Sequence, residues 1–198
     1  LNRMPGGTSA VLRLRRALMR RLRARPELAA IEADLLHLLT SWFNPGFLRM
    51  KRVDWNSPAQ LLEKIILHEA VHAIDGWDDL RRRLQPDRRC FAFFHPQLPD
   101  EPLIFVEVAL VKGMADNVQR LLDIEAPLAD AGRANTAIFY SISATQAGLR
   151  GVSFGNFLLK RVIDDLKRDF PRLKTFATLS PIPGLVRWVQ RNPEEFAS

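Results

Sequence analysis

Two histidines and a glutamate at helical spacing form the arrangement most suggestive of metal chemistry. His68, Glu69 and His72 match a His-Glu-x-x-His pattern, in which imidazoles one turn apart bind Zn²⁺ and the glutamate is the general base of a peptidase. However, both histidines continue the apolar stripe of Leu61 and Ile65, and the spacing marks no third ligand. We therefore predict that this helix packs against the core without a metal, with a zinc peptidase as a remote alternative.

The second candidate is a glycine-rich segment, residues 144–155, between a predicted strand and a predicted helix. Gly148, Gly151 and Gly155 permit backbone conformations and close approaches that a β-carbon would block. The free N–H groups that begin the following helix favour an anion by about 0.3–1 kcal/mol at an exposed site, and Arg150 adds a positive charge. The segment therefore indicates a diphosphate site. It has neither the G-x-G-x-x-G nor the P-loop pattern, and a ligand-free turn is the alternative.

The third candidate is Ser180, which opens a Ser-Pro-Ile-Pro-Gly turn directly after a predicted strand. Ligands of open α/β sheets bind beyond the carboxyl ends of the strands, and Ser143 lies at that end of the strand before the glycine-rich segment. Ser180 and the segment are therefore predicted to face one crevice. A nucleophile elbow needs the N–H of the residue after the serine, and Pro181 has none. We thus expect Ser180 to donate a hydrogen bond; satisfying its own strand end is the alternative.

The elements that position these residues begin with helices. Apolar residues recur at helical intervals, Pro26 separates the first two helices, and Ser57 followed by Pro58 is a clear helix start. Gly76 is expected to end the helix that carries the histidine pair. The predicted elements of this half are helices at about 8–24, 27–41, 58–74 and 77–84, and a short strand at 47–53.

The second half of the chain changes to β-rich runs. We predict antiparallel strands at 90–94 and 103–111 joined by a loop with three prolines, then helix 115–124, strand 136–143, helix 156–170, strand 173–180 and a last helix from about 185. The strand–helix–strand unit has crossover length, so its two strands should run parallel. The predicted fold class is α/β (α+β), a mixed sheet with flanking helices preceded by a short all-α segment.

Composition and charge exclude several classes of protein. The 198 residues are 47% hydrophobic, which excludes wholesale disorder, and one cysteine excludes a disulfide scaffold. No apolar run approaches the ~20 residues that span a bilayer.

The net charge of +7 comes from residues 1–26, which hold eight arginines and no acid. Residues 27–198 hold 21 basic and 22 acidic residues. We therefore predict no nucleic-acid and no membrane partner. For the basic segment, a transit peptide, a membrane-surface helix, a nucleic-acid helix and an ordinary solvated face stay open.

Several long, collinear segments carry a resemblance to one known family; they are residues 75–84, 88–95, 101–110, 139–143, 146–157 and 179–184. Together they resemble malonyl-CoA decarboxylase over essentially the whole chain. The resemblance implies that residues 1–40 end an N-terminal helical domain. It also implies that residues 41–198 form an incomplete catalytic domain with a GNAT-like fold.

The resemblance implies a reaction and its site. The reaction is the decarboxylation of malonyl-CoA to acetyl-CoA and CO2 through an enolate, with no metal and no organic cofactor. Ser180 and Ser141 match catalytic serines of the family. The stretch that matches the CoA-binding loop comprises Arg150, Gly151, Val152, Ser153, Phe154, Gly155 and Asn156. A homo-oligomeric full-length enzyme, cytoplasmic in bacteria or in an organellar matrix in eukaryotes, is also implied.

This sequence departs from the family pattern in two places. Ser153 stands where some relatives have a carboxylate. The catalytic histidine of the family, which closely follows an Asn-Pro-Val-Ala motif, has no match here, so these 198 residues alone are expected to be poorly active. A GNAT-type acyl-CoA transferase and a CoA-binding module without catalysis are the alternatives. The transferase would pass on the acyl group and release no CO2 from malonyl-CoA.

Overall fold

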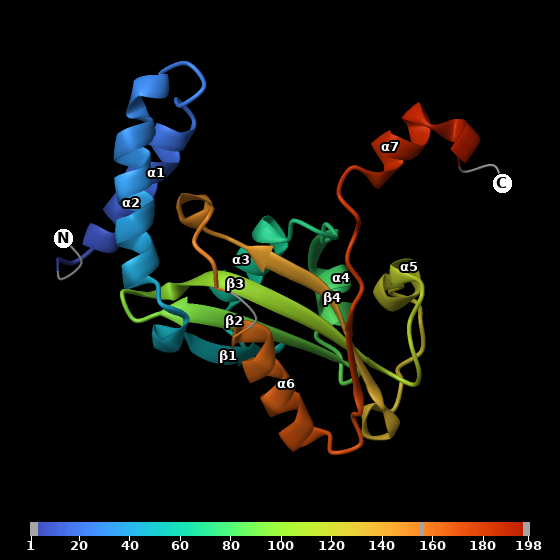
Figure 1. The fold of residues 1–198 in the computed structure, drawn as a ribbon. Coiled ribbons are helices and arrows are strands. Elements are labelled where there is room, and N and C mark those ends of the chain that lie inside the picture. Colours follow the sequence, from blue (N-terminus) through green and yellow to red (C-terminus); the bar gives the residue numbers. More distant parts are fainter. Residues whose placement is uncertain (1–3, 155–156, 196–198) are drawn as a thin grey trace.

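A computed structural model describes residues 4–154 and 157–195. Two α-helices come first, a five-stranded sheet follows with further helices between its strands, and a last α-helix lies close to the end of the described part of the chain (Figure 1). The α-helices are α1 (Gly7–Met19), α2 (Ala29–Trp42), α3 (Ala59–His68), α4 (Gly76–Arg83), α5 (Val118–Leu122), α6 (Phe157–Asp169) and α7 (Leu185–Arg191). The strands are β1 (Arg49–Val53), β2 (Arg88–His95), β3 (Leu98–Val111), β4 (Thr136–Ala144) and β5 (Thr175–Thr178). Short 3-10 helices include η3 (Ala131–Arg133) and η4 (Ala147–Leu149). None of the helices in these two ranges is long and apolar enough to cross a membrane.

The sheet has the strand order β1-β2-β3-β4-β5. Neighbouring strands are antiparallel except for β4 and β5, which run parallel and are connected through α6. The predicted strand–helix–strand unit is therefore confirmed. So is the fold class, a mixed α/β sheet with flanking helices behind an all-α segment.

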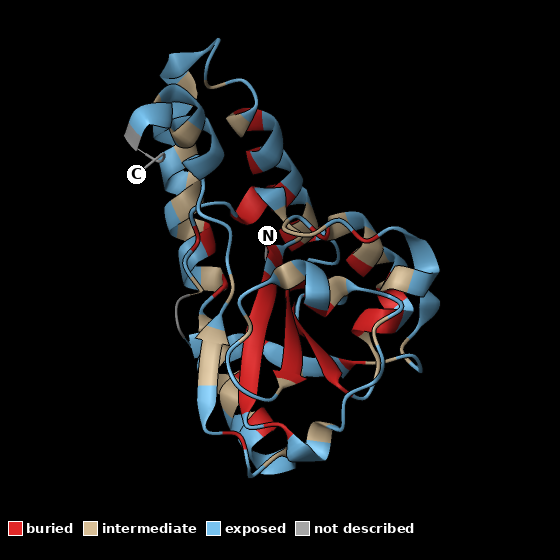
Figure 2. Ribbon diagram, turned by 90° about the vertical axis from the view of Figure 1, so that its right-hand side faces the viewer, coloured by how far each residue is buried: buried red, intermediate tan, exposed pale blue. Residues whose placement is uncertain are grey.

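Helices cover both faces of the sheet, which explains the near-continuous apolar runs of β2 and β3. On one face, Leu39 of α2 and Val162 of α6 belong to the largest buried cluster. On the other face, Ile65 of α3 and Leu80 of α4 pack against β2 and β3, and Leu121 of α5 packs against β3 and β4. The buried residues consequently concentrate in the central strands, whereas β5 is only partly covered (Figure 2).

The helix that carries the histidine pair ends at His68 and not near residue 74 as predicted. Glu69 leaves the helix with a ψ of 115°. Its carboxylate accepts the N–H groups of Val71 at 2.8 Å and His72 at 2.9 Å. These N–H groups thus have a side-chain partner in place of a helical carbonyl, and a new helix, α4, starts at Gly76.

The proline-containing loop predicted between the first antiparallel strands is a tight turn. β3 begins at Leu98, directly after Pro96 and Gln97, and its register with β2 shifts on both sides of Phe94. Pro102 lies within β3 opposite Phe94, at this irregularity. Bulges are among the few positions where a strand accommodates a proline, which cannot donate a ladder hydrogen bond. The predicted antiparallel pairing itself is confirmed.

Candidate active site

A β-bulge in β4 turns Ser141 toward the helices that follow β1. The register between β3 and β4 shifts after Glu107, which pairs with Ser141, and leaves Tyr140 as the extra residue. An extra residue breaks the strict alternation of side chains between the two faces. Ser141 therefore faces the side covered by α3, α4 and α5, the same side on which Ile138 packs.

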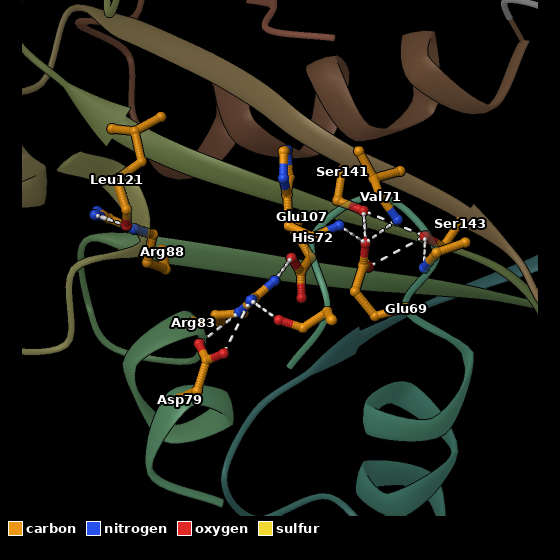
Figure 3. A network of polar contacts seen from close by, with 12 residues as sticks. Glu69, Val71, His72, Asp79, Arg83, Arg88, Glu107, Leu121, Ser141 and Ser143 are labelled. Carbon is orange, nitrogen blue, oxygen red and sulfur yellow. Dashed lines mark hydrogen bonds and ion pairs between the residues drawn. The ribbon is translucent and has the colours of Figure 1, made fainter. Parts of the chain in front are cut away.

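Ser141 and Ser143 both donate hydrogen bonds to the carboxylate of Glu69 (Figure 3). The Ser141 hydroxyl lies 2.8 Å and 2.7 Å from the two carboxylate oxygens, and the Ser143 hydroxyl lies 3.1 Å from one of them. All three residues are buried. Together with the N–H donors of Val71 and His72, the serines stabilise a buried carboxylate that has no cationic partner among the described residues.

Glu69 is the residue of this site that the sequence analysis missed, because it considered Glu69 only in the remote zinc-peptidase alternative. The His-Glu-x-x-His spacing suggested a general base on a zinc-binding helix. In the structure α3 ends at His68, so the two histidines do not share one helix. Burial lowers the pKa of His72, and no cluster of metal-ligating side chains occurs within residues 4–154 and 157–195. The sequence did contain one signal for such a partner. Ser141 and Ser143 occupy alternate positions of an otherwise apolar strand, which indicates that a polar group faces them.

A buried ion pair lies next to this group of residues (Figure 3). Arg83 donates to Glu107 at 3.0 Å and forms two hydrogen bonds with Asp79, at 2.8 Å and 3.1 Å. Burial raises the pKa of Glu107 to about 7, although the charge of Arg83 acts in the opposite direction. The second oxygen of Glu107 has no partner among the described residues. Burial also raises the pKa of Cys90 well above its usual value, which makes this thiol a poor nucleophile.

The glycine-rich loop is held directly against α1. Gly148 lies in η4, and a β-carbon there would collide with the backbone carbonyl of Leu12. The buried guanidinium of Arg15 donates to the carbonyl of Gly148 at 2.6 Å and also pairs with Glu32 of α2. Gly151 has a φ of 87°, which favours glycine. Two of the predicted glycine roles, a close approach and a left-handed backbone, are thus confirmed.

The predicted CoA-binding residues occupy different environments. Arg150 and Ser153 are exposed, Val152 is buried, and Phe154 packs partly buried against the largest core cluster. The predictions for Gly155 and Asn156 lie outside the described residues. α6 begins directly afterwards, at Phe157.

Ser180 follows the carboxyl end of β5 and is exposed. β5 pairs with β4 only as far as Phe139, and the last bond between the two segments runs from the N–H of Leu179 to the carbonyl of Phe139 at 2.9 Å. Because the strands are parallel, Ser180 and the glycine-rich loop leave the same edge of the sheet, as predicted. Among the described residues, no hydrogen bond joins Ser180 to Ser141 or to that loop.

The fold and this edge define an α/β domain with a mixed sheet, with a glycine-containing loop and a serine turn at the carboxyl ends of its parallel strands. The chain belongs to the malonyl-CoA decarboxylase family. The family model described as the malonyl-CoA decarboxylase C-terminal domain matches residues 46–197, and the one described as the N-terminal domain matches residues 1–43.

Similar proteins include enzymes from animals and structures from bacteria. The mitochondrial malonyl-CoA decarboxylases of Anser anser anser and Mus musculus are 43% and 40% identical, over 96% of this chain and 39% and 40% of their own lengths. Solved malonyl-CoA decarboxylases from Rhodopseudomonas palustris and Agrobacterium vitis are 54% and 53% identical, with TM-scores of 0.91 and 0.88. They are matched over 100% and 98% of this chain and 48% of theirs. The chain therefore spans about two fifths of these curated relatives and about half of these solved ones.

Proposed function

We propose that this chain carries the CoA loop and part of the acyl site of a malonyl-CoA decarboxylase, which converts malonyl-CoA into acetyl-CoA and CO2. The observation that carries the proposal is the shared edge of β4 and β5, from which the glycine-rich loop and Ser180 emerge. At such an edge the loop can bind the diphosphate of a CoA thioester while Ser180 reaches its acyl group. The family match supports malonyl as the acyl group.

The reaction requires charge stabilisation and one proton transfer. The bond between the α-carbon and the carboxylate breaks, CO2 leaves, and the bonding electron pair forms an enolate whose charge lies on the thioester oxygen. Fixed donors aimed at such an oxygen are worth about 3–4 kcal/mol each in comparable sites. An acid then delivers a proton to the α-carbon. No metal and no organic cofactor is part of this proposal, because the CoA thioester is itself the substrate.

Ser180 is proposed as a hydrogen-bond donor to the acyl end of the substrate. Its exposure at the end of β5 leaves the hydroxyl accessible. Pro181 has no N–H for an oxyanion hole of the hydrolase type. Donation by the hydroxyl is therefore favoured over nucleophilic attack.

Ser141 is proposed to act in a fixed orientation. Both oxygens of Glu69 lie within 2.8 Å of its hydroxyl, so its proton is directed toward that carboxylate. The lone pairs of Ser141 are then free to accept a hydrogen bond. The donor of that hydrogen bond is proposed to be the water or acid that later gives its proton to the α-carbon.

The CoA diphosphate is proposed to bind at Arg150, Gly151, Val152, Ser153, Phe154, Gly155 and Asn156. The positive charge of Arg150, the left-handed Gly151 and the start of α6 directly after the loop support this proposal. The anchoring of Gly148 by Arg15 holds the loop in place before substrate binds.

The activity is tested by acetyl-CoA formation from malonyl-CoA. We expect slow turnover by the 198 residues and faster turnover by a C-terminally extended version that carries the Asn-Pro-Val-Ala motif and its histidine. In the extended version, Ser180→Ala should lower kcat by about 10²-fold or more. Full activity of the 198 residues would show that the histidine is dispensable, and unchanged turnover of Ser180→Ala would remove Ser180 from the mechanism.

A GNAT-type acyl-CoA transferase is the second candidate, because the family resemblance implies the fold of that class and the same CoA loop would serve it. A transferase would move the acetyl group of acetyl-CoA to an amine or thiol and would release no CO2 from malonyl-CoA. Measuring CO2 release and acyl transfer on the same preparation separates the two functions. A module that binds CoA without catalysis would give neither product.

We further propose a role in fatty acid metabolism, in the cytoplasm of a bacterium or in an organellar matrix. The solved relatives are bacterial, and the curated relatives are named mitochondrial.

We also propose that the full-length enzyme is a homo-oligomer. Light scattering of the purified extended chain tests the oligomeric state, and a monomer at micromolar concentration would contradict it.

A further inference from the structure

Three arginines line a cavity between α1 and the glycine-rich loop. The cavity has a volume of about 370 Å³, and its lining residues are Arg16, Met19, Arg20, Leu22, Ala147 and Arg150. Arg16 and Arg20 are one helical turn apart and therefore lie on one side of α1. A volume of this size lies within the range of small-molecule sites and is larger than one phosphate group fills.

The protein does not neutralise the positive charge of this cavity. No carboxylate of the described residues forms an ion pair with Arg16, Arg20 or Arg150. α1 has no acidic residue in its first turn, and residues 1–26 contain no acid at all. Like charges around one cavity repel each other, so binding of an anion there is favourable.

The two walls of the cavity are fixed relative to each other. Arg15, which precedes Arg16 in α1, is only 1% exposed and donates to the carbonyl of Gly148 at 2.6 Å. Its guanidinium also binds Glu32 of α2. On the loop side, Gly148 contacts the backbone of Leu12 with no room for a β-carbon. The cavity is therefore largely preorganised, which reduces the cost of binding.

We infer that this cavity binds the 3′-phosphate and adenine end of the CoA thioester, an inference that rests on the proposed function. In CoA one ribose carries both the diphosphate chain and the 3′-phosphate. A diphosphate bound from Arg150 onward consequently leaves the 3′-phosphate within reach of Arg16 and Arg20. Guanidinium groups match phosphate oxygens in geometry and charge, and Met19 and Leu22 offer apolar surface to the adenine. This gives the basic helix a specific role.

The inference is tested by comparing CoA with 3′-dephospho-CoA, which lacks only the phosphate in question. Isothermal titration calorimetry on the 198-residue chain should show about tenfold weaker binding of 3′-dephospho-CoA. The difference should shrink at high ionic strength, because salt screens partly exposed charges. Adenosine 3′,5′-bisphosphate should compete with CoA, whereas inorganic phosphate at the same concentration should not.

Variants assign the effect to residues. Arg16→Ala and Arg20→Ala should each weaken CoA binding several-fold and leave the affinity for 3′-dephospho-CoA unchanged. Arg13→Ala is the matched control, because Arg13 is exposed on the same helix and does not line the cavity. Its affinities for both ligands should equal those of the parent chain.

The outcomes separate this inference from the proposed function. Equal affinities for CoA and 3′-dephospho-CoA would overturn the inference and leave the decarboxylase proposal intact. The inference would also be overturned if Arg16→Ala weakened the binding of both ligands equally, or if Arg13→Ala weakened CoA binding as much as Arg16→Ala does. Either result would indicate only a general effect of charge. Binding of neither ligand would overturn both the inference and the proposed CoA loop.

Discussion

At the residue scale, Glu69 shows how one carboxylate can connect two distant segments. It lies directly after α3, and it accepts hydrogen bonds from Ser141 and Ser143 of β4. The N–H of Ala70 in turn donates to the Ser143 hydroxyl at 3.1 Å. The end of α3 and the bulged part of β4 are thereby held in one arrangement, in which Ser141 has a defined orientation.

The variant Glu69→Gln tests this orienting role. Glutamine replaces one accepting oxygen with an NH2 donor, so Ser141 should lose its fixed orientation. We expect kcat of the extended chain to fall by about tenfold or more with little change in KM, and the free energy of unfolding to fall by about 1–3 kcal/mol. Glu63→Gln, on the exposed side of α3, is the control and should change neither. A wild-type kcat for Glu69→Gln would show that Ser141 does not depend on Glu69.

Glu107 should make the stability of the protein depend on pH. Burial raises the pKa of Glu107 from 4.5 to about 7. Between these two pH values the carboxyl of Glu107 keeps its proton in the folded state and loses it in the unfolded state. The stability that Glu107 contributes is therefore complete below pH 4.5 and is lost as the pH rises through about 7. The loss amounts to up to about 3 kcal/mol.

The variant Glu107→Gln, which cannot ionise, tests this pH dependence. Urea unfolding at several pH values between 4 and 8 should show a flatter profile of unfolding free energy for the variant than for the parent chain. Two parallel profiles would mean that Glu107 stays ionised in the folded protein, balanced by Arg83.

At the scale of elements, α1 and η4 approach each other closely at Gly148, where a β-carbon would lie closer than 3.0 Å to the carbonyl oxygen of Leu12. Gly148→Ala would place a β-carbon against the Leu12 carbonyl, so either α1 or the loop must move. We expect a loss of about 1–3 kcal/mol in the free energy of unfolding and weaker CoA binding, because the loop carries Arg150. Thermal unfolding and calorimetry measure the two effects.

Gly132→Ala is a matched control for this contact. Gly132 occupies the middle of η3 as Gly148 occupies the middle of η4. A β-carbon at Gly132 would meet only the side-chain oxygen of Asp130, at 3.2 Å. That oxygen also accepts the Gly132 N–H at 2.9 Å, so a shift of a few tenths of an ångström relieves the contact and keeps the hydrogen bond. Its stability and CoA affinity should therefore stay close to those of the parent chain. Equal effects of the two substitutions would argue that the approach to α1 is not what constrains Gly148.

At the scale of the whole molecule, the two ends contribute unequally to stability. α7 contains no buried residue and lies away from the sheet (Figure 1). In α1, by contrast, Val11, Leu12 and Arg15 are buried. Removal of residues 185–198 should therefore shift Tm by less than about 2 °C, whereas removal of residues 1–19 should lower it by much more. Circular dichroism melts measure both, and a large loss on removing α7 would reveal a packing role for that helix.

Much of the architecture follows from local sequence patterns. The apolar period, Pro58 and the length of the segment between β4 and β5 correctly predicted the early helices and the parallel strand pair. The boundaries were less predictable, because they depend on side chains elsewhere. α3 ends where Glu69 accepts two backbone N–H groups, and β3 starts earlier than predicted because its bulges accommodate proline.

The sequence alone determined that the glycine-rich loop and Ser180 leave one edge of the sheet, since strand direction follows from the crossover between consecutive parallel strands. Only the tertiary structure decided which side chains meet. Ser141 reaches Glu69 because of a bulge whose position depends on pairing with β3. Arg15 reaches Gly148 across 133 residues of chain. Contacts of this kind depend on how separate elements pack, and local periodicity carries no information about that packing.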